Sequence, residues 1–400
     1  MGDSRPTATP DDDASPKVAW INDPRIRGLV YQVLLIAAIV WLGYEVVTNA
    51  ATNLARQNIA SGFGFLSNTA GFSITQTLID YSEQSSYGRV FWVGFINTIL
   101  VAVIGIIFAT VVGFVVGIAR LSKNWVISRL ATAYVEVLRN IPLLLQLFFW
   151  YFAVLRTVPN PRQSIDIGGL LFLNNRGLFS PRPLFEDGAG IIGIIFLLAL
   201  AASLILRRIA RQRQEATGKR LPVLWISLGL MVGLPLIAFF ALGMPIGVEM
   251  PELKGFNFVG GMRIIPELVG LVLALSIYTA AFIAEIVRAG ILAVSHGQTE
   301  AAYSLGLKPS PTLRLVIIPQ AMRVIIPPLT SQYLNLTKNS SLAVAIAYPD
   351  LVSVFAGTVL NQTGQAVEVL LITMLVYLGL SLVTSLFMNW YNARMALVER

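Results

Sequence analysis

Long stretches without a single charged residue recur along this 400-residue chain, and they restrict the fold classes open to it. A membrane-spanning α-helix needs about 20 consecutive apolar residues. Only 12% of the residues are charged, whereas soluble globular chains carry about 25%. We therefore predict an all-α integral membrane protein with about eight transmembrane helices. The predicted spans cover residues 28–44, 90–119, 140–155, 188–206, 221–248, 268–284, 324–349 and 369–393.

The distribution of Lys and Arg predicts how these spans are oriented. The polar segments between eight spans form two sets on opposite sides of the membrane. The set that includes both termini and residues 207–220 carries 20 of the 29 basic residues, the other set carries eight, and Lys338 lies within a span. Because cytoplasmic loops are enriched in Lys and Arg, both termini are predicted to be cytoplasmic. The net charge of +8 then requires no nucleic-acid partner.

The N-terminal 89 residues and the basic segment 207–220 differ in character from the remaining spans and loops. Residues 1–27 are polar and acidic, which predicts a disordered cytoplasmic tail. Residues 28–89 are expected to form a first transmembrane helix and a segment on the outer side, because the long acidic lead is unlike a signal peptide. Arginines in 207–220 could contact anionic lipid headgroups. A solvated, positively charged cytoplasmic loop is the alternative that we favour.

The segment between the sixth and seventh predicted spans carries helix-capping signals. Ser295 followed by Gln298 is typical of a capping box and predicts the start of a short helix. Gly306 is expected to end that helix in a left-handed conformation. Ser310 with Pro311 predicts the start of a second helix. The result is a compact helix–turn–helix that suits docking of a soluble partner, with an ordinary amphipathic interfacial loop as the alternative.

Several motifs in and around this segment resemble those of ABC-transporter permeases. The five residues that match the EAA motif of that family are Glu300, Ala301, Ala302, Gly306 and Pro319. Residues 134–146, 319–323 and 338–342 resemble the polar amino-acid branch of the family. The overall layout is most similar to the long permease subunit of general L-amino-acid importers of the Aap/Bzt type. The resemblance covers residues 90–392 and is interrupted by inserted helices at about 188–248.

This resemblance implies a type I ABC importer permease core with extra spans, in the bacterial inner membrane. It implies import of L-amino acids, polar and of broad specificity, by alternating access, with 291–323 as the cytoplasmic coupling loop. The implied partners are a second permease subunit in a hetero- or homodimer, a cytoplasmic ABC ATPase, a periplasmic amino-acid-binding protein and membrane lipid. No cofactor or metal is implied. The chain itself is not expected to be an enzyme, because Gly218-Lys219 is followed by Arg220 and not by the Ser or Thr of a nucleotide-binding loop.

Ionisable residues at membrane depth are functional candidates by default. A zwitterionic substrate favours a pathway with one basic group, one acidic group and small hydroxyls. Lys338 and Glu136 fit the basic and the acidic group. The candidate pathway residues are Glu136, Arg139, Asn140, Lys338, Ser340 and Ser341. The alternative is that these charges pair or anchor helix ends, as we also expect for Glu285 and Arg288, which are three residues apart.

A second function class remains open from the residues alone. An ion-coupled secondary amino-acid transporter would act without an ATPase and would need a relay of intramembrane carboxylates or paired broken helices. Glycine pairs in the spans are interpreted as close helix packing through small residues, not as nucleotide-binding motifs. These glycines are Gly113 and Gly117, Gly188, Gly190 and Gly193, and Gly229 and Gly233.

Overall fold

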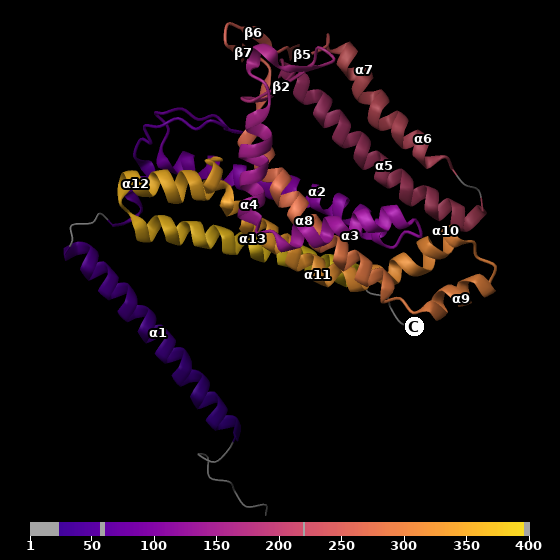
Figure 1. Ribbon diagram of the computed structural model, residues 1–400, viewed down its shortest axis with the longest axis horizontal. Coiled ribbons are helices and arrows are strands. Elements are labelled where there is room, and N and C mark those ends of the chain that lie inside the picture. Colours follow the sequence, from indigo (N-terminus) through magenta and orange to yellow (C-terminus); the bar gives the residue numbers. More distant parts are fainter. Residues whose placement is uncertain (1–23, 57–60, 219–220, 396–400) are drawn as a thin grey trace, which may run out of the picture.

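The computed structural model describes residues 24–56, 61–218 and 221–395, and these residues are mainly helical (Figure 1). The α-helices are α1 (Pro24–Arg56), α2 (Tyr87–Arg120), α3 (Trp125–Asn140), α4 (Leu143–Phe148), α5 (Ala189–Thr217), α6 (Val223–Leu228), α7 (Leu234–Ala241), α8 (Pro266–Leu292), α9 (His296–Ser304), α10 (Pro309–Thr312), α11 (Ile318–Asn339), α12 (Leu360–Thr363) and α13 (Ala366–Met395). Shorter 3₁₀ and π segments are η2 (Phe63–Ser67), η3 (Phe149–Val154), η4 (Leu155–Thr157), η5 (Pro161–Gln163), η6 (Gly229–Gly233), η7 (Leu313–Ile317), η8 (Ser340–Ile346) and η9 (Val352–Val359).

The number of spans agrees with the predicted fold class. Within the described residues, seven helices are long and apolar enough to cross a membrane, and a bent helix pair raises the number to eight. That pair corrects the predicted span 140–155, because the chain bends by 108° between Trp125–Asn140 and Leu143–Thr157. The bend falls at Ile141 (φ −95°, ψ 128°), since the ring of Pro142 disfavours helical backbone at the preceding residue.

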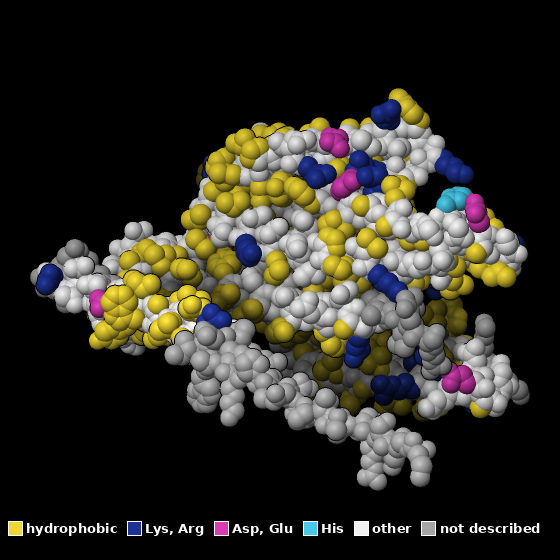
Figure 2. All heavy atoms as spheres, turned by 90° about the horizontal axis from the view of Figure 1, so that it is seen from below, with side chains coloured by type: hydrophobic (Ala, Val, Ile, Leu, Met, Phe, Trp, Pro, Cys, Tyr) yellow, Lys and Arg dark blue, Asp and Glu magenta, His cyan; other side chains and the backbone are white. Residues whose placement is uncertain are grey.

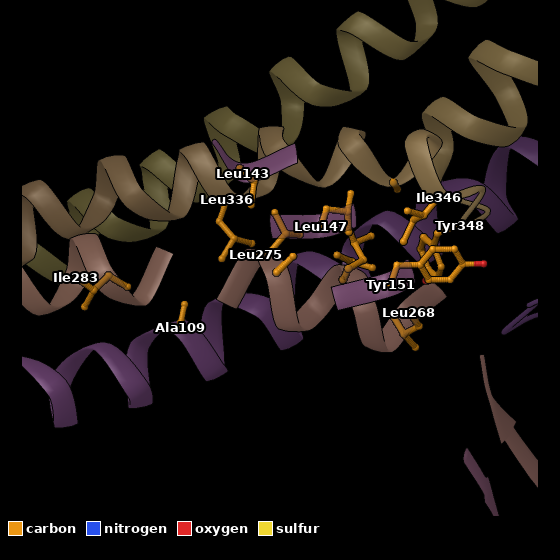
Figure 3. Close-up of a cluster of buried hydrophobic side chains, with 14 of the residues drawn as sticks. Ala109, Leu143, Leu147, Tyr151, Leu268, Leu275, Ile283, Leu336, Ile346 and Tyr348 are labelled. Atoms are coloured by element: carbon orange, nitrogen blue, oxygen red, sulfur yellow. The ribbon is translucent and has the colours of Figure 1, made fainter. Parts of the chain in front are cut away.

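A closely packed core is built around α2, α8 and α11 (Figure 3). α2 and α8 lie together along most of their length because glycines let their backbones approach. A Cβ atom added at Gly113 would lie 2.6 Å from the Cβ atom of Ile283, and one at Gly117 would lie 2.7 Å from the carbonyl oxygen of Ala284. The predicted small-residue packing is therefore confirmed at this pair. The surrounding buried side chains include Leu271, Leu275, Ile325 and Leu336.

Two segments that flank the inserted helices form a small β unit that the all-α prediction did not contain. The strands are β1 (Ile165–Ile167), β2 (Leu171–Asn174), β3 (Gly177–Ser180), β4 (Arg182–Phe185), β5 (Ile246–Glu249), β6 (Glu252–Lys254), β7 (Asn257–Val259) and β8 (Met262–Ile264). One antiparallel sheet has the order β1-β2-β3-β8, and β4–β5 and β6–β7 are separate pairs. The predicted span 221–248 is correspondingly too long, since its helix ends at Ala241 and β5 follows.

Between β4 and β5 the chain forms a helical hairpin of α5, α6 and α7, which projects away from the main bundle (Figure 1). The main packing partners of α5 are α6, η6 and α7 of the same hairpin. A Cβ atom added at Gly193, Gly229 or Gly233 would have no atom within 4 Å. In the described residues, the predicted small-residue packing is therefore not found in the hairpin.

The first helix stands apart from the rest of the bundle (Figure 1). α1 contains a candidate span, Ile26–Asn49. The most apolar part of this span has no buried residue. Most of the predicted tail, residues 1–23, lies outside the described residues. The segment that follows α1 includes η2, where Phe65 is buried against Tyr87 and Phe355. This segment is thereby fixed to the N-terminal end of α2.

Candidate coupling loop and substrate pathway

α9 forms where the sequence predicts a helix, but its start is stabilised differently. Ser295 is the N-cap residue and has extended backbone (φ −60°, ψ 141°), yet its side chain makes no capping hydrogen bond. The Gln298 side chain also does not complete a capping box. Its Oε1 accepts a hydrogen bond from Nε2 of Gln320 at 3.2 Å. The predicted capping box is therefore wrong, because Gln298 is used to link α9 to the start of α11.

The end of α9 agrees with the prediction in detail. Gly306 has φ +75°, a left-handed conformation that a side chain would strain. Its N–H donates to the carbonyl of Tyr303 at 2.9 Å, and the N–H of Leu307 donates to the carbonyl of Ala302 at 3.1 Å. These two hydrogen bonds constitute a Schellman motif, which satisfies the last carbonyls of the helix. The chain can therefore reverse sharply after nine helical residues.

The second helix of the loop begins one residue before its predicted cap. Lys308 is the N-cap residue and Pro309 opens α10, whereas Ser310 and Pro311 were expected in those roles. Pro309 suits the first helical position because it has a preset φ and no N–H to satisfy. α10 continues through η7 into α11, and α9 packs against both α10 and η7. The predicted helix–turn–helix is therefore confirmed with a shifted boundary.

Most residues of the EAA motif lie on the surface at this end of the molecule. Glu300, Ala301, Gly306 and Pro319 are exposed, whereas Ala302 is buried. Nδ1 of His296 lies 3.0 Å from Oε1 of Glu300, and both side chains are exposed. Figure 2 shows this single His beside an acidic side chain at the protein surface.

An apolar tip accompanies these polar groups. Leu305 is 83% exposed, and Tyr303 is also largely exposed. Exposed large apolar residues gathered next to a capped helix are typical of a protein–protein contact surface. We call α9, Leu305 and Gly306 the coupling tip. Its geometry suits insertion of a short rigid helix into a concave partner.

An ion-pair network joins α2, α3 and α8. Glu285 accepts hydrogen bonds from Arg288 (Nη2 to Oε1, 2.6 Å) and from Nη1 of Arg120. Arg120 also pairs with Glu136 (Nη2 to Oε1, 3.9 Å). The expected pairing of Glu285 with Arg288 is confirmed, and Glu136 joins the same network. This supports the alternative in which these charges fix the positions of helices.

The other predicted pathway residues of α3 also have partners. The guanidinium of Arg139 lies 5.1 Å from the ring centroid of Phe282. Nδ2 of Asn140 donates to the carbonyl of Glu136 at 2.6 Å. No hydrogen bond or ion pair of the described residues connects this group with Lys338. In the described part of the chain, the polar contacts of these α3 residues are therefore made within α3 and with α2 and α8, and they do not include Lys338.

The second group lies where α11 changes into η8. Lys338 is exposed, whereas Ser340 is fully buried and donates its hydroxyl proton to the carbonyl of Thr337 at 2.7 Å. The Ser341 hydroxyl donates to the Lys338 carbonyl at 2.7 Å. Ser331 and Asn335 are exposed at positions that share the helix face of Lys338. These three residues form a polar stripe on a span otherwise packed against α8 and α13.

A buried polar cluster next to η8 was missed in the sequence. Asp350 is fully buried, and its carboxylate accepts hydrogen bonds from the Ser353 N–H (2.8 Å) and the Tyr377 hydroxyl (3.3 Å). Nearby, Nδ2 of Asn97 donates to the Pro349 carbonyl at 2.8 Å. These bonds close the break between η8 and η9. An acidic residue directly after a proline inside an apolar region was the available signal.

Long apolar helices around a close-packed core, with a capped helix exposed at one end, define a polytopic membrane protein as the class of this chain. The chain belongs to the family described as the binding-protein-dependent transport system inner membrane component, whose family model matches residues 109–397. It is therefore a membrane-spanning permease of an ABC transport system in the inner membrane. This membership gives no support to the ion-coupled alternative.

Two curated relatives match nearly the whole chain. The general L-amino acid transport system permease protein AapQ of Rhizobium johnstonii is 55% identical over 378 residues, which is 94% of each protein. The glutamate/glutamine/aspartate/asparagine transport system permease protein BztB of Rhodobacter capsulatus is 42% identical over 415 aligned residues, which cover 95% of this chain and 96% of BztB. Both matches include the inserted β unit and helical hairpin within the aligned length.

Proposed function

We propose that this chain is the translocation subunit of an ABC importer for L-amino acids of broad, mainly polar specificity. The observation that carries the proposal is the 55% identity to a general L-amino acid permease over 94% of both chains. The similarity to a permease for acidic amino acids and their amides supports polar substrates. The chain carries no catalytic role in this proposal, and ATP hydrolysis belongs to a partner.

The coupling tip is proposed to dock on a cytoplasmic ABC ATPase. Glu300 in α9 presents a carboxylate close to the helix N-terminus and can meet a basic residue of the ATPase. Leu305 supplies apolar contact area, and Gly306 fixes the direction in which the chain returns. Closure of the ATPase would move this tip and tilt the spans attached to it, which is alternating access driven from a distant site.

The polar stripe of α11 is the part of the proposed pathway that the structure supports most directly. Exposed polar groups at membrane depth are costly in lipid, so they call for a second subunit or a water-filled passage beside them. Lys338 can attract a substrate carboxylate, with Ser331 and Asn335 as hydrogen-bonding groups along the same face. Ser340 and Ser341 support the turn behind it. Glu136, Arg139 and Asn140 stay candidates on their chemistry alone, because their contacts in the structure fit a role in fixing helix positions.

The remaining assignments complete the proposed assembly. A second permease subunit covers the α11 face in a hetero- or homodimer, and a periplasmic binding protein delivers the amino acid. Residues 90–392 form the permease domain, 28–89 the first span with its periplasmic segment, and 291–323 the cytoplasmic coupling loop. Both termini then lie in the cytoplasm. The excess of Lys and Arg in the segments on that side supports this orientation.

Reconstitution tests the proposal directly. The chain is placed in proteoliposomes with its partner permease, ATPase and binding protein, and uptake of labelled glutamate, glutamine and leucine is measured. We expect uptake that requires ATP on the ATPase side. Lys338→Met should raise the KM for uptake at least fivefold, whereas Lys123→Met, at an exposed position outside the spans and the coupling loop, should not. Uptake driven by an ion gradient in the absence of the ATPase would overturn the importer assignment.

A further inference from the structure

A groove of about 570 Å³ lies between α5 and α6 of the inserted hairpin. This volume is in the range of small-molecule sites. Its apolar wall is formed by residues of both helices and of η6. The apolar lining residues include Phe196, Leu200, Leu204, Leu224, Leu228 and Met231. These side chains belong to candidate spans, so this part of the groove suits a hydrocarbon chain.

The depth of the groove matches one leaflet of a bilayer. The stretch of α5 from Phe196 to Arg207 rises by about 16 Å at 1.5 Å per residue. The hydrocarbon core of a bilayer is about 30 Å thick, so this wall extends over half of it. The first charged residue along the wall is Arg207, where the hydrocarbon region is expected to end. The groove is therefore long enough for one acyl chain, and its polar end lies at Arg207.

The polar end of the groove is arranged along one helix face. Ser203, Arg207 and Arg211 follow each other at four-residue intervals and all line the groove. Ser203 is 5% exposed, yet its hydroxyl has no hydrogen-bond partner in the described residues. A buried hydroxyl without a partner is costly, so this atom calls for a ligand group.

The two arginines at the polar end of the groove have hydrogen-bond donors that could bind an anion. Arg207 forms no hydrogen bond or ion pair with the described part of the chain. Nε of Arg211 bonds to Oε1 of Glu215 at 3.0 Å, and both side chains are well exposed. The guanidinium of Arg211 still has further donors to offer. A solvated loop would account for exposed arginines, but it would not account for the groove or for the Ser203 hydroxyl.

We propose that this groove binds an anionic phospholipid of the cytoplasmic leaflet. The phosphate lies between Arg207 and Arg211, an ester carbonyl accepts a hydrogen bond from Ser203, and an acyl chain lies along Leu200 and Leu228. Ser203 is one helical turn deeper than Arg207, as the ester groups of a phospholipid are deeper than its phosphate. On this basis the inserted hairpin is a lipid-binding element, and cytoplasmic leaflets supply the anionic headgroups.

Lipid binding by the purified importer complex tests this inference without any transport measurement. Native mass spectrometry is used to titrate the complex with phosphatidylglycerol or with phosphatidylcholine of the same chain length. We expect at least tenfold tighter retention of phosphatidylglycerol. Arg207→Gln combined with Arg211→Gln should reduce it to the phosphatidylcholine level, and Ser203→Val should weaken it about fivefold, since one hydrogen bond is worth about 1 kcal/mol.

The matched control removes the same charge from the same helix. Arg208 and Arg213 do not line the groove, so replacing both with Gln should change phosphatidylglycerol binding less than twofold. Leu200→Trp should fill the groove and weaken both lipids. Equal loss in the two double variants, equal retention of the two lipids, or displacement of the lipid by millimolar inorganic phosphate would overturn the proposal. These lipid-binding results decide the proposal whether or not amino-acid uptake is normal.

Discussion

The core bundle and the inserted hairpin carry similar glycine pairs and use them differently. In the core, Gly113 and Gly117 let α2 approach α8 so closely that an added Cβ would overlap with Ile283 or with backbone. In the hairpin, Gly229 and Gly233 have the same four-residue spacing, but no atom lies within 4 Å of an added Cβ. The spacing of small residues therefore permits close approach, and the facing helix decides whether approach occurs.

The difference in packing separates two kinds of helices in one chain. Helices of the core are fixed by buried side chains, ion pairs and the buried Asp350 cluster. The hairpin is held mainly by its own helices and by the β4–β5 pair. Matched changes in the two regions should therefore have different effects, larger in the core than in the hairpin.

The largest effect is expected from a bulky residue at the closest helix contact. Gly113→Leu should destabilise the complex by more than about 3 kcal/mol, because the backbone carbonyl of Ala280 lies only 3.1 Å from an added Cβ and cannot yield easily. Gly229→Leu should be neutral or stabilising by up to about 1 kcal/mol, since a helical glycine is replaced in open space. Thermal unfolding of the purified complexes measures both. Equal stability of the two variants would remove the distinction between the regions.

The next largest effect, on ATP-driven uptake, is expected from reversing the charge of Glu300 in α9 and comparing it with Glu215 near the end of α5. Glu300→Lys should reduce ATP-driven uptake at least tenfold while the membrane fold is retained, because Glu300 is exposed and contacts only His296 by its side chain in the described residues. The same change in the hairpin, Glu215→Lys, should leave uptake within twofold. Uptake and co-purification of the ATPase are measured together. Uptake at the unmodified rate in the Glu300 variant would exclude a coupling role for this carboxylate.

A smaller effect is expected from neutralising one carboxylate in each region. Glu285→Gln should cost about 1–2 kcal/mol, because two arginines lose their shared, partly buried partner. Glu215→Gln breaks an exposed i,i+4 pair and should cost less than about 0.5 kcal/mol. Denaturant titration of each variant gives the two values. A larger loss for Glu215 would show that the hairpin is more tightly integrated than its packing indicates.

The smallest effect on transport is expected from removing the hairpin. Phe185 and Ile246 are paired across β4 and β5, and the N–H of Glu186 donates to the carbonyl of Pro245 at 2.9 Å. Residues 187–244 can therefore be replaced with an Asn-Gly turn that closes the two strands. Assembly and uptake should stay within twofold of the full chain, while the phospholipid binding proposed above should be lost. Failure of the shortened chain to assemble would place the hairpin in the structural core.

Several features governed by neighbouring residues were predictable from the sequence, although the capping box at Ser295 was not one of them, because Gln298 bonds to Gln320 in α11. The spans follow from the absence of charge, and the end of α9 follows from Gly306, since helix termination is a local matter. The orientation of Glu285 towards Arg288 follows from their three-residue spacing. Each of these depends on residues within one or two turns of each other.

Features that depend on distant partners were not predictable. β3 pairs with β8 through Leu178 and Ile264, which are separated by the whole hairpin, and strands of three or four residues leave little periodicity. The buried state of Asp350 depends on Tyr377 and on neighbours from α2 that no local pattern reveals. Glu136 was grouped with Lys338 by chemical type, whereas its partner Arg120 lies at the end of another helix.

The exposed Leu305 has a consequence for how many copies of this subunit a cell can keep. An unassembled subunit presents a large apolar side chain to water at the coupling tip, next to other exposed apolar residues. Such a surface is recognised by chaperones and proteases until a partner covers it. If the tip docks on the ATPase as proposed, synthesis in excess of the ATPase should shorten the lifetime of the subunit and keep the numbers of the two proteins matched.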